Sequence, residues 1–168
     1  METLNKLLIA GYAQNFVAML GLLISLYGLI VELMLERDPT YKPMCDVSEA
    51  VSCSKALHSS FATGLGVVEP VLGKDNLFNQ KNAAYGLVVY AALLLLGSLF
   101  SRSVTVARIH LAIAVFMNLL SVYLAAILVY LQTLCLVCLA TYAVNFALLL
   151  LAIYRLRCLR GLSQKKAQ

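Results

Sequence analysis

The sequence is poor in charge. Of its 168 residues, 12% are Asp, Glu, Lys or Arg and 62% are hydrophobic, whereas soluble domains are about 25% charged and about 45–50% apolar. A soluble globule of this length leaves roughly 30% of its unfolded surface exposed, so it could not hide this many apolar side chains. Disordered chains are poor in aliphatic residues, and the length suits one domain. The composition therefore excludes a soluble globular protein and a disordered chain, and it predicts one integral membrane domain.

Histidines, phosphate-binding loops and alternating strands are also scarce or missing. The two histidines, His58 and His110, fall on opposite sides of the expected membrane domain and lack ligand spacing to a cysteine pair. No glycine-rich loop follows a strand, and no Ser-His-Asp arrangement stands out. The apolar runs are continuous rather than alternating, which argues against a β-barrel. We therefore expect no metal site and no tightly bound cofactor.

Long runs without charge predict four membrane-spanning helices. Three runs, of 25, 20 and 46 residues, contain no Asp, Glu, Lys or Arg: 7–31, 82–101 and 109–154. About 20 helical residues cross a hydrocarbon core roughly 30 Å thick, so the longest run holds two spans joined by a turn near 130–134. We expect an all-α four-helix bundle whose spans lie near 7–32, 82–101, 107–130 and 133–155.

Basic residues predict the orientation of these spans, because short loops rich in Lys and Arg stay in the cytosol. They gather at three places that four spans put on one side: Lys6, then Arg102 and Arg108, then Arg155, Arg157, Arg160, Lys165 and Lys166. Both termini, including the tail 156–168, are therefore expected in the cytosol, and the loop 33–81 on the opposite side. The net charge of +5 follows from this orientation, so we expect no binding to nucleic acid.

Four of the five cysteines are expected at the opposite membrane surface. Cys45 and Cys53 lie in the loop 33–81, and Cys135 and Cys138 form a CxxC motif where the fourth span begins. This surface faces an oxidising space in a eukaryotic secretory membrane or a periplasm. Cys158 lies on the cytosolic side and is excluded from the group.

The CxxC spacing suits redox chemistry. Residues at i and i+3 of a helix have Cβ atoms about 5–6 Å apart. Free N–H groups and the helix dipole in the first turn favour the thiolate, which is the form that attacks disulfides. The alternative is that Cys135 and Cys138 are small apolar packing residues.

Cys45 and Cys53 are too far apart on a straight helix to bridge, since eight residues span about 12 Å and a disulfide needs Cα atoms about 4.4–6.8 Å apart. Either the loop folds back on itself or each cysteine recombines with other partners. A permanent structural disulfide is the alternative to a redox role. Together the two pairs predict an electron relay from a thiol in the oxidising space to an acceptor in the lipid.

A quinone fits that acceptor. Cys135, Cys138 and Tyr142 share one face of the fourth span at i, i+3 and i+7, and Asn82 begins the second span at the same membrane level. Asn and Tyr both offer hydrogen-bond donors, which suit two quinone oxygens in a low-dielectric pocket. The alternatives are a helix cap for Asn82 and an interfacial aromatic for Tyr142.

The segment 61–77, here called the lid segment, is apolar in patches but is broken by Glu69, Pro70, Lys74 and Asp75. It cannot span a membrane, and its apolar residues suit half-burial at the interface. We expect a lid over the pocket, or an interfacial segment without a gating role.

Several motifs resemble one known family along nearly the whole chain. They are ERD, MCDVSEAVSCS, GLGVVEPVLGKDNLFNQKNAAYG, SVYLAAIL and CLVCLATYAVN. Two cysteines separated by seven residues, an N-x-x-x-G at the second span and a CxxC followed by TY are together specific. On these residues the chain resembles the vitamin K epoxide reductases. Its last four residues, KKAQ, also resemble a dilysine signal for retrieval to the endoplasmic reticulum.

The resemblance implies a bundle around a quinone pocket that reduces vitamin K epoxide to the quinone, and the quinone to hydroquinone. Cys138 would engage the substrate, with Cys135 as its resolving partner. Cys53 would exchange with Cys135, and Cys45 would receive electrons from a lumenal thioredoxin-fold protein. The proton needed to open the epoxide would come from Tyr142 or from water.

The resemblance also implies hydrogen bonds from Asn82 and Tyr142 to the substrate, and contacts of both residues and the lid segment with coumarin inhibitors such as warfarin. Five residues are candidates for the lid and pocket: Leu57, Phe61, Leu65, Tyr85 and Val89. Family members often carry aromatic residues at positions 57 and 65 and a larger residue at 89, so inhibitor affinity and lid packing are expected to differ.

Two other functions use the same features. A quinone-linked thiol oxidase of the bacterial disulfide-forming kind would have the same parts, with electron flow serving disulfide synthesis. A four-span scaffold of the claudin type would account for a Cys45–Cys53 disulfide but not for the CxxC motif.

Overall fold

The computed structural model describes residues 2–38, 40–100 and 103–167. Its elements are α1 (Glu2–Arg37), α2 (Cys53–Leu57), η1 (Ser60–Ala62), η2 (Gly64–Gly66), α3 (Val68–Leu72), α4 (Asn82–Leu99), α5 (Val104–Tyr130) and α6 (Leu136–Ala167). Within these ranges the only β-type pairing is in two isolated bridges. The expected all-α architecture is therefore confirmed.

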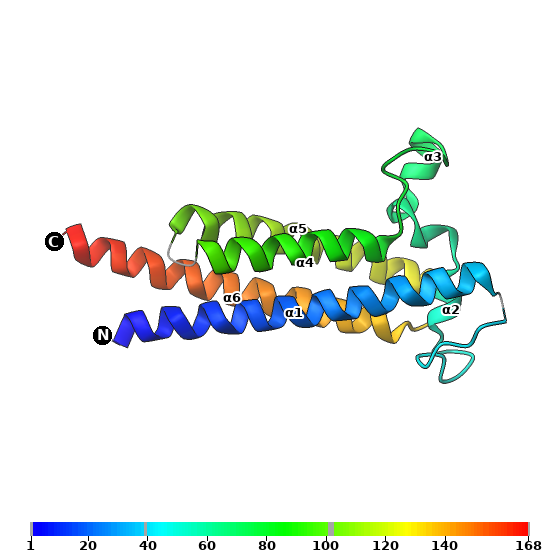
Figure 1. Ribbon diagram of the computed structural model, residues 1–168, viewed down its shortest axis with the longest axis horizontal. Helices are drawn as coiled ribbons and strands as arrows, with labels where there is room; N and C mark the ends of the chain where they lie inside the picture. The colour runs from blue at the N-terminus through cyan, green and yellow to red at the C-terminus, as the bar shows by residue number, and fades with distance from the viewer. Residues whose placement is uncertain (1, 39, 101–102, 168) are drawn as a thin grey trace.

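Four helices, α1, α4, α5 and α6, are long and apolar enough to cross a membrane. They lie roughly parallel to one axis (Figure 1), with α1 packed against α4 and α6, and α5 packed against α6. Large apolar side chains face outward along them, and Phe16, Val88 and Leu119 are each 65% exposed or more. Soluble proteins rarely expose such surface, so lipid is the solvent that this bundle requires.

The two ends of the bundle differ. Both termini lie at one end, together with the end of α4 and the beginning of α5 (Figure 1). The short elements α2 and α3 lie at the opposite end, where α6 also begins. This grouping matches the one expected from the basic residues; which end faces the cytosol stays a prediction. We call the end that carries α2 the loop end.

The helix boundaries differ from the expected spans. α1 continues to Arg37 rather than ending near residue 32, α6 begins at Leu136 rather than 133, and it continues past 155 to Ala167. Charge marks where a helix leaves the hydrocarbon, but Leu, Met, Glu and Arg are good helix formers, so these helices extend further. Of the residues used above, Arg102 and Gln168 lie outside the described residues, as do the side chains of Lys165 and Lys166.

Polar side chains inside the bundle bond to one another. The Tyr90 hydroxyl donates to Asn145 Oδ1 (2.6 Å), and Asn145 Nδ2 donates to Ser121 Oγ (2.9 Å). Nearer the termini, Arg155 Nη1 donates to Gln14 Oε1 (2.9 Å). These bonds join α6 to α4, α5 and α1. Because lipid offers no partner for a polar group, they favour this arrangement of the helices.

Close contact between α1 and α4 depends on Gly21. A Cβ atom at Gly21 would lie 2.5 Å from Cε1 of Tyr90, whose fully buried ring is held by its bond to Asn145. We expect Gly21→Ala to lower the free energy of unfolding by about 1–3 kcal/mol, as overpacked cores do. Thermal unfolding in detergent would measure this.

Gly11 is the matched control on the same helix, because a Cβ there would meet no atom within 4 Å. Gly11→Ala is expected to leave stability unchanged or to raise it by about 0.5–1 kcal/mol, since alanine favours helix. Equal shifts for the two variants would contradict the packing argument.

Candidate active site

Two loops meet at the loop end of the bundle through a short backbone pairing. Val51 forms a parallel bridge with Leu134. The N–H of Ser52 donates to the carbonyl of Leu134 (2.9 Å), and the N–H of Leu134 donates to the carbonyl of Ala50 (2.8 Å). Cys53 follows Ser52 and Cys135 follows Leu134 along these two parallel segments. The pairing therefore explains how two cysteine pairs far apart in sequence reach one place.

Cys45 and Cys53 form a disulfide, with Cα atoms 5.7 Å apart. The loop folds back on itself, which is the first of the two expected arrangements. Ser52 caps α2, its side chain accepting from the N–H of Lys55, and Asp46 Oδ1 accepts from the N–H of Ser54 (3.0 Å). Asp46 Oδ2 accepts from the Ser54 hydroxyl (2.5 Å). Partial burial by itself would raise the pKa of Asp46. The hydrogen bonds outweigh this effect and lower the pKa below its usual value.

The CxxC motif begins one residue before α6. Cys135 occupies the N-cap position, since its carbonyl accepts from the N–H of Leu139 (2.9 Å), and its sulfur accepts from the N–H of Cys138 (3.4 Å). This is the contact that a Ser or Asp side chain makes at an N-cap. Hydrogen bonding to the Cys138 side chain lowers the pKa of Cys135, and the backbone N–H groups of Cys138 and Val137 lower it further. Burial raises this pKa, but the net change is downward. The motif thus stabilises a thiolate on Cys135.

The four loop-end cysteines belong to one packed cluster: Cys45, Cys53 and Cys135 are buried, and Cys138 packs against them. Cys135 and Cys138 are free thiols. Asp46 lies within 4.8 Å of both disulfide sulfurs, but a disulfide offers no thiolate to a metal. Cys158 packs against a different cluster, with Leu7 and Leu156. Its expected separation from the group is confirmed.

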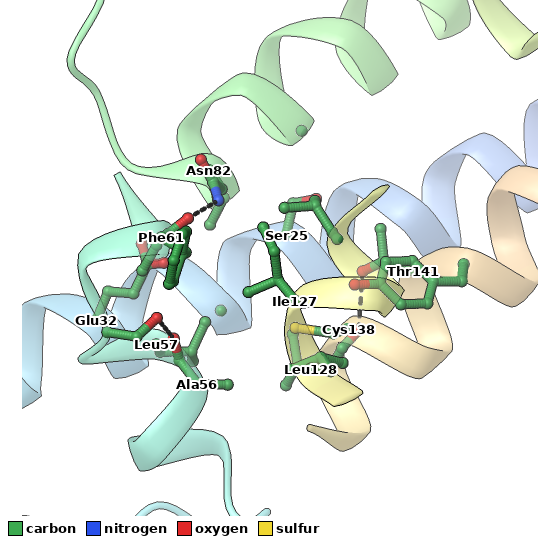
Figure 2. A pocket seen from close by; sticks show the side chains of 18 of the residues that line it. Ser25, Glu32, Ala56, Leu57, Phe61, Asn82, Ile127, Leu128, Cys138 and Thr141 are labelled. Atoms are coloured by element: carbon green, nitrogen blue, oxygen red, sulfur yellow. Dashed lines mark hydrogen bonds between the residues drawn. The ribbon is translucent and has the colours of Figure 1, made fainter. Parts of the chain in front are cut away.

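A mostly apolar cavity opens between α1, α4, α5, α6 and the segment 56–62. Figure 2 shows Cys138 on α6 facing this cavity. Leu57 and Ala56 on α2 lie across from it, and Asn82 at the start of α4 lies above them in this view. Its polar lining residues are Ser25, Glu32, Ser59, Asn82, Cys138, Thr141 and Tyr142. Cys135 has no exposed surface and is not among the lining residues. Of the described cysteines, Cys138 is the one that a molecule in this cavity can reach.

Asn82 is the first residue of α4, and the N-cap is Lys81, so the helix-cap interpretation is wrong. Its side chain holds the lid segment instead: Nδ2 donates to the carbonyl of Phe61 (2.8 Å; Figure 2). Oδ1 accepts from the N–H of Leu65 (2.9 Å). One N–H of the Asn82 amide is left for a ligand, because an amide nitrogen carries two hydrogens.

The lid segment contains three short helical elements, η1, η2 and α3. Of these, α3 projects away from the bundle (Figure 1). Leu65 has a φ of 57°, which places its backbone in the left-handed region. Its carbonyl accepts from the Tyr123 hydroxyl on α5 (3.1 Å). With the bond to Asn82, this fixes Leu65 to two spanning helices.

The candidate lid and pocket residues divide into two groups. Leu57 and Phe61 line the cavity. The others are not among its lining residues: Leu65 is tied to Asn82 and Tyr123, the Tyr85 hydroxyl donates to the carbonyl of Phe78, and Val89 packs on the central core.

Glu32 and Tyr123 belong to the site but are not among the residues expected from the sequence. Glu32 coincides with the charged end of the expected first span, yet it lines the cavity with Ser25 and Gly28. Its spacing of seven and four residues from them is the signal that could have placed it on the same helix face. Tyr123 carries no such signal, because its partner is a backbone carbonyl 58 residues away.

Comparison with known proteins matches the chain to one family. The model described as "Vitamin K epoxide reductase family" covers residues 14–153, which include all four loop-end cysteines. A relative from Mus musculus, named "Vitamin K epoxide reductase complex subunit 1", is 38% identical over 143 residues, 84% of this chain and 88% of that protein. One of the same name from Rattus norvegicus is 41% identical over 133 residues, 79% of this chain and 81% of that protein.

Proposed function

The chain belongs to the vitamin K epoxide reductase family and is a thiol-dependent oxidoreductase, and we propose that it carries electrons from a lumenal thioredoxin-fold protein to vitamin K epoxide or quinone. The observation that carries this proposal is the arrangement of the loop-end cysteines. An outer disulfide, a buried thiol and a cavity-facing thiol lie in one cluster. Family membership removes the scaffold alternative.

The proposed route has two exchanges. A dithiol donor attacks Cys45 and reduces the Cys45–Cys53 disulfide. The Cys53 thiolate then attacks Cys135 of an oxidised Cys135–Cys138 pair, and re-formation of Cys45–Cys53 leaves the inner pair reduced. The structure has an outer disulfide and two inner thiols, the distribution expected after electrons have moved inward. The lowered pKa of Cys135 supports its role in exchange, since thiolates are the reactive form.

At the cavity, Cys138 attacks the substrate and Cys135 resolves the adduct, so the inner pair ends as a disulfide. The apolar walls suit a naphthoquinone with an isoprenoid chain. Asn82 and Tyr142 donate hydrogen bonds to its oxygens, and vitamin K is a substrate rather than a resident cofactor. Coumarin inhibitors occupy the same cavity in this proposal, against the smaller side chain of Leu57.

The loop end faces the lumen of the endoplasmic reticulum in this proposal, with both termini in the cytosol. The basic residues near the terminal end support this orientation under the positive-inside rule. An oxidising lumen also suits the disulfide at the loop end.

The proposal is tested by anaerobic turnover of vitamin K epoxide by the purified protein with dithiothreitol, with products separated by chromatography. We expect formation of the quinone. No product from folded protein would contradict the proposed substrate, and ubiquinone and menaquinone would then be assayed as acceptors. Reduction of either at the expense of a substrate protein's thiols would favour the thiol oxidase instead.

Asn82→Ala is expected to raise the KM for vitamin K epoxide roughly fivefold, because it removes one hydrogen bond to the substrate worth about 1 kcal/mol. It also removes two hydrogen bonds to the lid segment, which should loosen that segment. Steady-state kinetics and hydrogen exchange of residues 61–66 would measure both effects. The control is Asn76→Ala, whose side chain bonds to the N–H of Phe78 in an exposed turn. Faster exchange with an unchanged KM would mean that Asn82 holds the lid segment but not the substrate.

A further inference from the structure

Glu32 is a carboxyl group inside the apolar bundle. It lies on α1 five residues before the helix ends, is 2% exposed and lines the same cavity as Cys138. Figure 2 shows the two residues on opposite sides of that cavity. Neither carboxyl oxygen accepts a hydrogen bond from any of the described residues. The route proposed above makes no use of this group.

The surroundings of Glu32 favour its neutral acid form. Burying a charge without hydrogen bonds is costly, and such groups take up a proton instead. The titratable groups close enough to interact with it are Lys81, Glu36, Cys135 and Cys138. Lys81 is the one cation of these, and it is already ion-paired with Glu36. A protonated Glu32 in this setting can donate its proton to a bound substrate, because no described residue is hydrogen-bonded to its carboxyl group.

Opening an epoxide requires such a proton. When a thiolate forms a bond to an epoxide carbon, the carbon–oxygen bond breaks and leaves an alkoxide, which is strongly basic. A carboxylic acid is stronger than a phenol by about six pKa units in model compounds. Of the other polar groups in the cavity, the Thr141 and Ser59 hydroxyls donate to the carbonyls of Val137 (2.8 Å) and Ala56 (2.7 Å). The Ser25 hydroxyl and the Asn82 amide are far weaker acids than a phenol, and Cys138 is the nucleophile. Tyr142 is the remaining side chain acid, and the weaker one.

We propose that Glu32 is the proton donor for epoxide opening, an inference that rests on the proposed function. The Cys135 thiolate takes the proton of Cys138, the Cys138 thiolate so formed attacks an epoxide carbon, and the freed oxygen takes the proton of Glu32. Cys135 then attacks the Cys138 sulfur, so the S–S bond forms as the S–C bond breaks. The electron pair left on carbon expels the hydroxyl group, which leaves as water with the Cys135 proton. The products are the quinone, a disulfide and the Glu32 carboxylate, which is reprotonated when the donor dithiol delivers its protons.

The test compares two substrates in single turnovers of protein whose inner cysteine pair has been reduced beforehand. Glu32→Gln keeps the size of the side chain and removes the acidic proton. We expect epoxide reduction to slow about 100-fold, at the low end of general acid catalysis. Quinone reduction breaks no carbon–oxygen bond and forms phenolate oxygens, which are far weaker bases than an alkoxide, so its rate is expected to change less than about fivefold. Glu49→Gln, in an exposed loop at the same end of the molecule, is the control for loss of a carboxyl.

The outcomes separate the two proposals. Wild-type protein that does not reduce the epoxide would overturn the proposed function and this inference with it. Active wild-type protein with an equally active Glu32→Gln variant would overturn this inference alone. Equal slowing with both substrates would also overturn it, since that pattern indicates a change in structure or binding. Thermal unfolding of the variant confirms that it is folded before the rates are compared.

Discussion

Replacing Cys138 with alanine is expected to abolish reduction of vitamin K epoxide with either a protein donor or dithiothreitol. Cys138 faces the cavity and its partner Cys135 has no exposed surface, so no other described thiol can reach the substrate. Loss of a nucleophile costs on the order of 10⁶ in rate in a well-studied hydrolase. We expect a fall of at least roughly 10⁴, measured as quinone formed under anaerobic conditions.

Cys158→Ala is the matched control, because it removes a free thiol that packs against Leu7 and Leu156 away from the site. It should turn over at the wild-type rate. Substantial activity of Cys138→Ala, with Cys158→Ala unchanged, would overturn the assignment of the nucleophile while leaving the membrane fold in place.

Cys45→Ala is expected to separate the two sources of electrons. With a thioredoxin-fold donor, turnover should fall by about 100-fold or more, because the protein donor has lost the disulfide that it attacks. With dithiothreitol, most of the activity should remain, since this small molecule can enter the cavity and reduce the Cys135–Cys138 disulfide at Cys138, which is half-buried rather than fully enclosed. The ratio of the two rates is the measurement.

Loss of the disulfide has a cost in stability, which the chain-entropy estimate puts at about 2–3 kcal/mol for a loop of this length. Both assays are therefore run at low temperature, on protein shown to be folded. Equal losses with the two reductants would indicate that the disulfide holds the fold together and carries no electrons. Unchanged turnover with the protein donor would mean that the donor reaches Cys53 or the inner pair directly.

Much of the fold follows from the distribution of charge in the sequence. Runs of 25, 20 and 46 residues without a charged side chain leave few alternatives to four helices, because each span must satisfy its own backbone. The grouping of Cys45, Cys53, Cys135 and Cys138 follows in turn, since an even number of crossings returns the chain to one side. These inferences need no knowledge of side-chain packing.

The remaining features depend on contacts that a pattern of hydrophobicity does not encode. Nothing in the sequence places Leu134 beside Val51, or gives the Asn82 side chain to two backbone groups of the lid segment. The burial of Glu32 is hidden from the sequence for a related reason. A charged residue indicates the end of a span, whereas α1 continues for five more residues and takes the carboxyl into the bundle.

The parallel pairing of Val51 with Leu134 has a consequence for selectivity among reductants. It places Cys53 and Cys135 where both have 0% exposed surface, so the proposed exchange between them would be closed to small thiols such as glutathione. Such molecules can act only at the two ends, on the outer disulfide or through the cavity. The middle of the proposed path is thus shielded from solvent. A mixed disulfide between Cys53 and Cys135 would be protected from exchange with thiols in the surrounding solution.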